Sequence, residues 1–176
     1  RPGTKRVGVL WGYVPPLHPI EEIEPCYREL RDAGRALKLA VEIEEVSTAG
    51  QVPSALEALG AKRVDALLVT SGPGLWFTRP MILKYAVDRR LPTIADFPQP
   101  PDNVLARPLL TYSPSWDLLL RQTASYVARV LKGGRPADMP IEQPAKFELE
   151  VNLQAARAIG LELPRSVLLR ADRVIE

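Results

Sequence analysis

The side chains best suited to chemistry follow short apolar runs of the chain, where aromatic, hydroxyl, carboxylate and glycine residues gather. Aromatic rings can stack on the apolar part of a small molecule, while a hydroxyl, a carboxylate or backbone amides fix its polar head. In an open α/β sheet such residues collect beyond the carboxyl ends of the strands, near the point where strand order reverses. We therefore expect a ligand-binding site formed by Trp11, Gly12, Tyr13, Ser71, Gly72, Asp96, Phe97 and Tyr112.

A purely structural role is the alternative for these residues: the rings would cap the sheet and Asp96 would cap a turn. Catalytic groups are harder to assemble. His18 is the only histidine, it lies between Pro16 and Pro19, and no nucleophile or supporting carboxylate is recognisable beside it. We expect His18 to be a surface-loop residue and predict no catalytic residue. A flavodoxin-like enzyme that uses Asp96 or His18 as a base is kept as an alternative.

Metal and cofactor sites are not indicated by the sequence. The Ser-Gly-Pro-Gly stretch at 71–74 offers backbone amides to an anion, but it lacks the lysine of a P-loop and the spacing of a dinucleotide-binding fingerprint. The acidic residues Glu42, Glu44 and Glu45 lie on an expected strand and provide only part of a metal shell. We expect a plain turn, a solvated strand face, and neither metal nor cofactor.

The composition narrows the class of protein. The 176 residues are 46% hydrophobic and 25% charged, which suits a globular domain. A net charge of +2 without a basic block argues against a nucleic-acid partner. Cys26 is the only cysteine, so no internal disulfide can form, and a buried, inert thiol is expected. The chain has no apolar run long enough for a membrane helix, and its start lacks a signal-peptide pattern.

Apolar runs and helical patterns alternate along the first part of the chain. Strands are expected at residues 6–11, 39–46, 64–70 and 91–95, and helices at 20–37, 52–59 and 79–89. The strand at 39–46 alternates apolar and acidic residues, which places it near an edge of the sheet. This order predicts an α/β fold with a doubly wound parallel sheet.

The pattern changes after Asp96. Residues 97–108 hold four prolines and are expected to form an extended loop before a strand at 109–112. A long amphipathic helix follows, with Ser113 as its N-cap and Pro114 in its first turn. Its apolar stripe consists of Trp116, Leu119, Leu120, Thr123, Val127, Val130 and Leu131.

The last part of the chain is expected to return to the sheet. The proline-rich residues 136–144 should be extended, and a strand at 146–151 and a short helix at 153–159 should follow. Without a partner, the stripe of the long helix would expose more apolar area than a soluble monomer normally tolerates. We therefore expect this helix to pack on something outside the sheet.

Four stretches of the chain match a known pattern in their order and spacing. They are RVGVLW, VDALLVT, LPTI and a long segment, LLTYSPSWDLLLRQTASYVARVLKGGRPADMPIEQPAKFELEVNLQAARAIGL. They resemble the carboxyl-terminal part of ABC transporter substrate-binding proteins of the aromatic-amino-acid and uncharacterised-ligand type. The resemblance covers nearly the whole chain and is most specific from Tyr112 onward. Gly12 departs from the pattern, since an Asn usually follows the first-strand Trp.

The resemblance implies one lobe of a type I periplasmic-binding-protein-like fold with flavodoxin-like topology, which traps a ligand against a second lobe. On that pattern, residues 1–112 form the second-lobe core. Residues 113–138 form a hinge and the helix that returns to the first lobe, and residues 139–176 cross back and complete the second lobe. The sheet of the first lobe is absent from these residues.

The function implied is that of the solute-binding component of an ABC importer rather than an enzyme. Its partners would be a transporter permease and a small ligand, with an amino acid or an aromatic or carboxylate compound as candidates. Its location would be periplasmic or otherwise extracytoplasmic, with a lipid anchor as an option. A homodimer through the Trp116–Leu131 helix would cover the apolar stripe. A ligand-sensing domain of a membrane receptor or regulator, and a complete single-lobe protein that acts as a dimer, are the alternatives.

Overall fold

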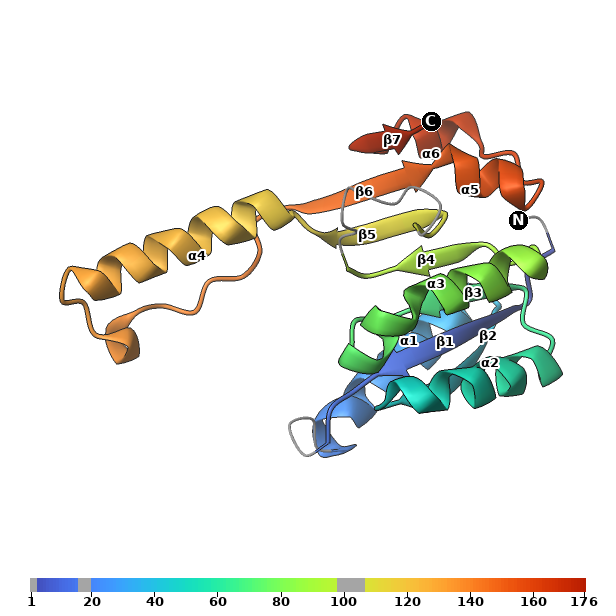
Figure 1. Cartoon of the computed structure of the whole chain (residues 1–176), viewed down its shortest axis with the longest axis horizontal. Coiled ribbons are helices and arrows are strands. Elements are labelled where there is room, and N and C mark those ends of the chain that lie inside the picture. Colours follow the sequence, from blue (N-terminus) through green and yellow to red (C-terminus); the bar gives the residue numbers. More distant parts are fainter. Residues whose placement is uncertain (1–2, 16–19, 98–106) are drawn as a thin grey trace.

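A single seven-stranded sheet forms the centre of the protein (Figure 1). The structure is a computed structural model that describes residues 3–15, 20–97 and 107–176. The strands are β1 (Arg6–Gly12), β2 (Ala40–Val46), β3 (Ala66–Val69), β4 (Thr93–Ala95), β5 (Leu110–Pro114), β6 (Phe147–Asn152) and β7 (Arg173–Ile175). The α-helices are α1 (Ile20–Ala36), α2 (Val52–Ala61), α3 (Pro73–Asp88), α4 (Trp116–Leu131), α5 (Leu153–Ala158) and α6 (Arg165–Leu168), with short 3-10 turns η1 (Ala49–Gln51) and η3 (Pro136–Asp138).

The strand order is β2-β1-β3-β4-β5-β6-β7. The first five strands are parallel and follow the flavodoxin-like order, in which the direction of strand succession reverses between β1 and β3. This confirms the predicted α/β fold and the edge position of the strand near residue 40. The sheet is not wholly parallel, because β6 runs antiparallel to β5 while β7 runs parallel to β6.

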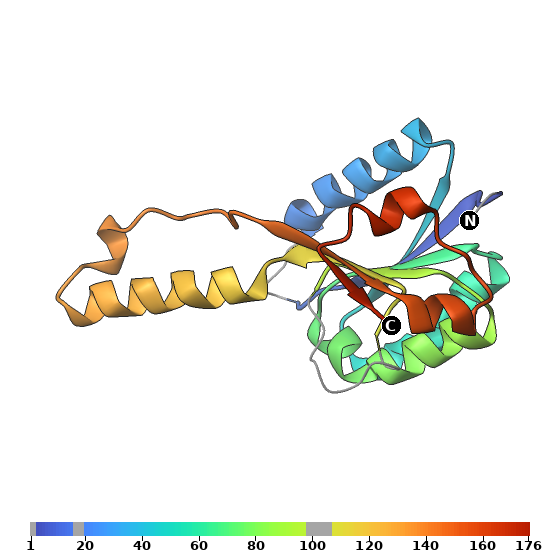
Figure 2. The ribbon, with the colours of Figure 1, turned by 90° about the horizontal axis from the view of Figure 1, so that it is seen from above.

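Helices cover both faces of the sheet, with α1 on one side and α2, α3 and α5 on the other (Figure 2). The main core lies under α2 and α3, where Leu10, Leu67 and Val69 of the strands meet Leu59 and Ile82 of the helices. A smaller apolar cluster forms under α5 around Leu109, Ala156 and Ile159. Burial of these side chains holds the strand ends, and therefore the loops that follow them, in fixed positions.

Helix α3 begins earlier than its sequence pattern predicts, at Pro73 instead of residue 79. Pro73 takes the first helical position, where its missing N–H costs nothing. Pro80 lies inside the helix and removes a bond to the carbonyl of Trp76. The Arg79 side chain replaces that bond, since its Nε donates to the Trp76 carbonyl at 3.1 Å. The residues predicted as a plain turn at 71–74 therefore lead directly into a helix.

The strand before α4 also differs from its prediction. Ser113 and Pro114 belong to β5, and Ser115 is the N-cap of the helix. The reason is pairing with β6, which continues through Pro114 opposite Phe147 and keeps the chain extended.

An arm built from α4 and residues 133–146 projects from the sheet (Figures 1 and 2). No residue of α4 is buried. The returning segment lies along the helix, where the Tyr126 hydroxyl donates to the Pro140 carbonyl at 2.5 Å and Gln122 Nε2 donates to Glu142 Oε2 at 2.7 Å. The arm is thus held together internally but is not packed on the rest of the protein.

Candidate ligand-binding site at the carboxyl edge of the sheet

The loops after β1 and β3 touch each other backbone to backbone at the point where strand order reverses. A Cβ atom added to Gly12 would lie 2.6 Å from the carbonyl oxygen of Ser71 and 2.8 Å from Cα of Gly72. A Cβ atom added to Gly72 would lie 2.6 Å from Cα of Gly12. The amide of Gly12 also donates to Oγ1 of Thr70 at 2.9 Å. This junction leaves no room for a side chain, and the close approach of the two backbones explains why position 12 is a glycine.

Asp96 lies at the end of β4, beside the Ser71 end of β3. Its amide donates to the carbonyl of Val69 at 3.3 Å. The residue as a whole is exposed, yet partial burial of its carboxyl raises the pKa of Asp96 to about 6. The backbone amides of Ser71 and of Asp96 itself donate to the carboxylate and oppose this rise. The structure therefore brings Gly12, Ser71, Gly72 and Asp96 together at the carboxyl ends of β1, β3 and β4.

Trp11 and Tyr13 continue the same edge on the side of α1. The Trp11 ring meets the Tyr27 ring of α1 edge to face, with centroids 5.3 Å apart and planes at 85°. Tyr27 is 4% exposed, and burial followed by the nearby Glu45 carboxylate raises the pKa of its hydroxyl. The amide of Tyr13 donates to the carbonyl of Val46 at 3.1 Å. Trp11, which is half-buried, therefore helps to seat α1 as well as bordering the candidate site.

Phe97 occupies a different environment from Asp96. Its side chain is buried in the main core, and its ring lies 5.7 Å from the ring of Trp76. The guanidinium of Arg79 lies 3.9 Å from the Trp76 centroid and 5.9 Å from the Phe97 centroid. Phe97 thus anchors the carboxyl end of β4 in the core. Trp76 and Arg79 were missed by the sequence analysis because both fall in a segment that was predicted as a turn and a helix start.

Tyr112 stands apart from the other predicted residues. It lies on β5, is 53% exposed, and stacks on Phe147 of β6 with centroids 5.5 Å apart and planes at 24°. The pair sits where β5 leads into α4 and β6 receives the returning chain. Tyr112 therefore belongs to the base of the arm. His18 lies outside the described residues.

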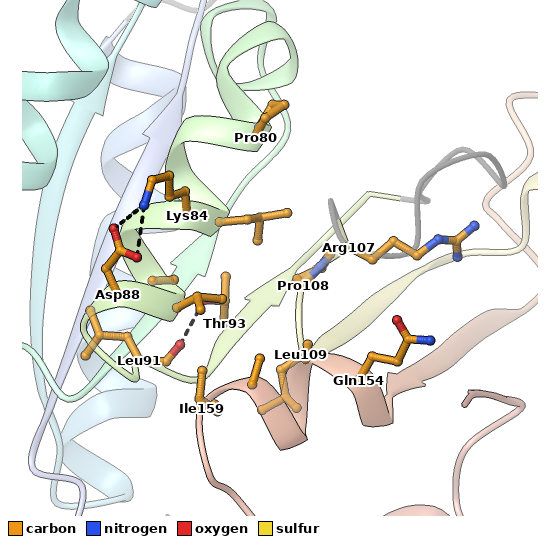
Figure 3. Close-up of a pocket in the computed structure, with 15 residues that line it drawn as sticks. Pro80, Lys84, Asp88, Leu91, Thr93, Arg107, Pro108, Leu109, Gln154 and Ile159 are labelled. Atoms are coloured by element: carbon orange, nitrogen blue, oxygen red, sulfur yellow. Dashed lines mark hydrogen bonds and ion pairs between the residues drawn. The ribbon is translucent and has the colours of Figure 1, made fainter.

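Two grooves lie elsewhere on the described part of the chain, and none of the eight predicted residues lines either of them. One, of about 490 Å³, separates α3 from α5 near the amino ends of β4 and β5, and its lining is mainly apolar (Figure 3). The other, of about 640 Å³, lies within the arm between α4 and the returning segment. At the carboxyl edge, Ser71 and Asp96 are exposed, and Gly12 and Gly72 are half-buried.

Within residues 3–15, 20–97 and 107–176, no group of three or more His, Cys, Asp and Glu side chains could hold a metal ion. Within the same ranges, none of the helices has the length and apolar character needed to cross a membrane.

The fold is that of a periplasmic-binding-protein-like α/β domain, and solved structures with this architecture superpose closely. The "ABC domain" from Streptococcus pneumonia, solved with L-Trp, matches with a TM-score of 0.81 at 22% identity and covers 99% of this chain. A conserved domain protein from Vibrio cholerae matches with a TM-score of 0.80 at 20% identity over 98% of this chain. A ligand-free, open substrate binding protein with adhesive properties from Clostridium difficile gives a TM-score of 0.64 at 19% identity over 99% of this chain.

The family follows from the sequence match. Residues 2–175 match the model of the ABC transporter substrate binding proteins, and the chain belongs to that family. It spans only about half of the solved relatives, at 56%, 55% and 55% of their lengths. No curated protein matches the chain significantly.

Proposed function

We propose that these residues form the second lobe of the solute-binding component of an ABC importer, which closes on a small ligand and delivers it to a transporter permease. The observation that carries this proposal is the arm. A helix of 16 residues with none buried stands away from the sheet of a chain that spans about half of its solved relatives. The proposed location is extracytoplasmic, in keeping with the family.

The arm supports a division of the chain into three parts, with a core at 1–112, a hinge and helix at 113–138, and a return at 139–176. The outward side chains are strongly apolar: Trp116 is 57% exposed, Leu131 82% and Ile141 99%. Exposed apolar area of this extent marks an interaction surface. We assign its partner as the first lobe, which the rest of a chain of the relatives' length would supply.

The carboxyl edge of the sheet supports the binding role. Gly12 and Gly72 keep the floor free of side chains, Trp11 and Tyr13 border it with aromatic surface, and Ser71 and Asp96 provide polar groups. Such a mixture suits a small molecule with an apolar body and a polar head. Because a structural neighbour was solved with L-Trp, an aromatic amino acid is the first ligand to test.

The test is isothermal titration of L-tryptophan and a panel of other amino acids and small carboxylates into the complete gene product. We expect saturable binding of at least one compound, and no turnover of it. Substitution Gly12→Val should abolish this binding, because the added side chain would collide with Ser71 and Gly72. Gly50→Val is the matched control, since a Cβ there meets no atom within 4 Å. Turnover of a ligand would favour the enzyme alternative.

A further inference from the structure

The groove between α3 and α5 lies where the two apolar clusters of the protein do not meet (Figure 3). Ala86 and Leu91 on one side of it belong to the main core, whereas Leu109 and Ile159 on the other side belong to the smaller cluster under α5. All four side chains are buried, yet they help to bound a space of about 490 Å³. The groove is therefore a pocket between two packed units and not an exposed helix face.

The α3–α5 groove is separate from the candidate ligand-binding site. It lies near the amino ends of β4 and β5, whereas Gly12, Ser71 and Asp96 lie at or directly after the carboxyl ends of their strands. The two regions share α3, which begins at Pro73 beside the candidate site and lines the groove from Pro80 onward. A molecule in the groove would therefore be a second ligand, bound away from the carboxyl edge of the sheet.

The polar side chains on the α3 side of the groove have partners within the protein. Lys84 Nζ donates to both carboxylate oxygens of Asp88, at 2.8 and 3.1 Å. Thr93 Oγ1 donates to the carbonyl of Leu91 at 3.2 Å. The charges of Lys84 and Asp88 thus neutralise each other at the edge of the groove.

The polar side chains on the opposite side are also engaged. Arg107 points away from α3 (Figure 3), and its Nη1 donates to Glu150 Oε1 at 2.6 Å. Gln154 Nε2 donates to the main-chain oxygen of Glu176 at 2.8 Å. Every polar side chain that lines the groove therefore has a partner inside the protein, and the remaining lining is apolar.

Charge complementarity selects an uncharged, largely apolar occupant. A charged molecule would lose its water in the groove without meeting a counter-ion that is not already paired. Water itself is a poor occupant, because apolar walls offer it too few hydrogen-bond partners. The volume of about 490 Å³ is typical of pockets that take small molecules.

We propose that the α3–α5 groove is a second ligand site, which binds uncharged apolar small molecules such as a compound of aromatic rings. This site is independent of the proposed solute-binding function, because none of the residues predicted for the candidate site lines the groove. Either function can therefore fail without the other.

A matched pair of fluorescent probes tests the proposal on the complete gene product. N-phenyl-1-naphthylamine is uncharged and apolar, and 8-anilinonaphthalene-1-sulfonate has the same rings with an added sulfonate. Both become brighter in apolar surroundings, so a fluorescence titration gives their affinities. The uncharged probe should bind saturably and at least roughly tenfold more tightly than the sulfonate, because the groove offers that charge no counter-ion.

Two variants locate the bound probe. Ala158→Trp on α5 and Val87→Trp on α3 add a ring to the groove from opposite sides, each at a position that is at least partly exposed. Each should weaken binding of the uncharged probe by at least roughly tenfold, because the new ring takes the apolar surface that the probe would cover. Ala33→Trp is the matched control, since Ala33 is an exposed alanine of α1, which covers the other face of the sheet (Figure 2).

Hydrogen exchange locates the probe without any substitution. The uncharged probe should slow amide exchange in peptides that cover residues 80–91 and 153–160, which contain both walls of the groove. Absence of saturable binding, equal affinity for the sulfonate, or no slowing in these peptides would each overturn the proposal. Full affinity in a groove variant that melts like the parent protein would place the probe elsewhere and overturn it as well.

The same preparation separates this site from solute binding. Titration of the amino-acid panel in Ala158→Trp should give the affinities of the parent protein, because the groove does not line the candidate site. Loss of amino-acid binding in this variant, with its fold intact, would show that the groove is not an independent site.

Discussion

At the scale of single residues, the candidate site depends on what is small as much as on what is reactive. Gly12 and Gly72 approach so closely that a Cβ on either would collide with the other's backbone. Both glycines, Ser71 and Asp96 were predicted to lie close together because the carboxyl ends of parallel strands meet at one edge, and the structure places them so. The same rule could not show that the side chain of Phe97 enters the core while that of Asp96 stays at the edge. The direction of a strand alone does not reveal which of two adjacent side chains is buried.

The ionisation of Asp96 should change the free energy of unfolding of the protein with pH. Its folded pKa of about 6 lies above the ordinary 3.8, so folding favours the protonated form. The stability that this group contributes is therefore fully present below about pH 4 and is lost as the pH rises through about 6. Asp96→Asn should stabilise the protein at neutral pH by up to about 1 kcal/mol, after allowance for the exposure of the residue.

Thermal melting of Asp96→Asn and of the parent protein between about pH 4 and about pH 7.5 checks this prediction. The difference in melting temperature should be smallest at the acidic end and should level off above the pKa. A difference that stays constant over the whole range would show that the carboxyl is not perturbed.

Among the helices and strands, the two helices whose starts were predicted wrongly, α3 and α4, both begin near prolines. The α/β class was predictable from the alternation of apolar runs with helical patterns, and the edge position of β2 from its alternating apolar and acidic residues. The start of α3 was not, because Pro80 reads as a helix break unless another group satisfies the Trp76 carbonyl. The start of α4 was misplaced for a related reason: Ser113 and Pro114 have the composition of a cap, but pairing with β6 keeps them extended.

Arg79 should be important for the stability of α3. Its Nε donates to the Trp76 carbonyl at 3.1 Å, and its guanidinium lies 3.9 Å from the Trp76 ring. Arg79→Ala should lower the free energy of unfolding by about 1–2 kcal/mol, because both contacts are lost. Arg35→Ala serves as a control, since Arg35 makes only an exposed ion pair on α1. Urea denaturation followed by fluorescence measures both, and equal small effects would contradict this role.

For the whole molecule, the arm is the feature that packing on the sheet does not account for, because α4 makes no buried contact with the sheet. The sequence predicted an amphipathic helix in need of a partner, and the structure leaves α4 without a buried residue. Either a first lobe or a second copy of the chain could cover the same apolar stripe. The coverage of about half of each solved relative favours the first lobe.

We propose that the arm packs on a first lobe of the same molecule. The most direct measurement is the rate of maleimide labelling of Val127→Cys in the complete gene product, in a Cys26→Ser background. Val127 on α4 is 53% exposed here, and Leu37→Cys, at a position that is 70% exposed beyond α1, is the control. Light scattering on the same sample reports its mass.

We expect Val127→Cys to react at least roughly tenfold more slowly than Leu37→Cys while the protein is monomeric, because burial of the arm excludes the reagent. Equal labelling rates at the two positions in a monomer would contradict it, since the arm would then be exposed in the complete molecule. Protection of Val127→Cys only in a dimer would show that the arm packs on a second copy of the chain, and it would also contradict packing on a first lobe.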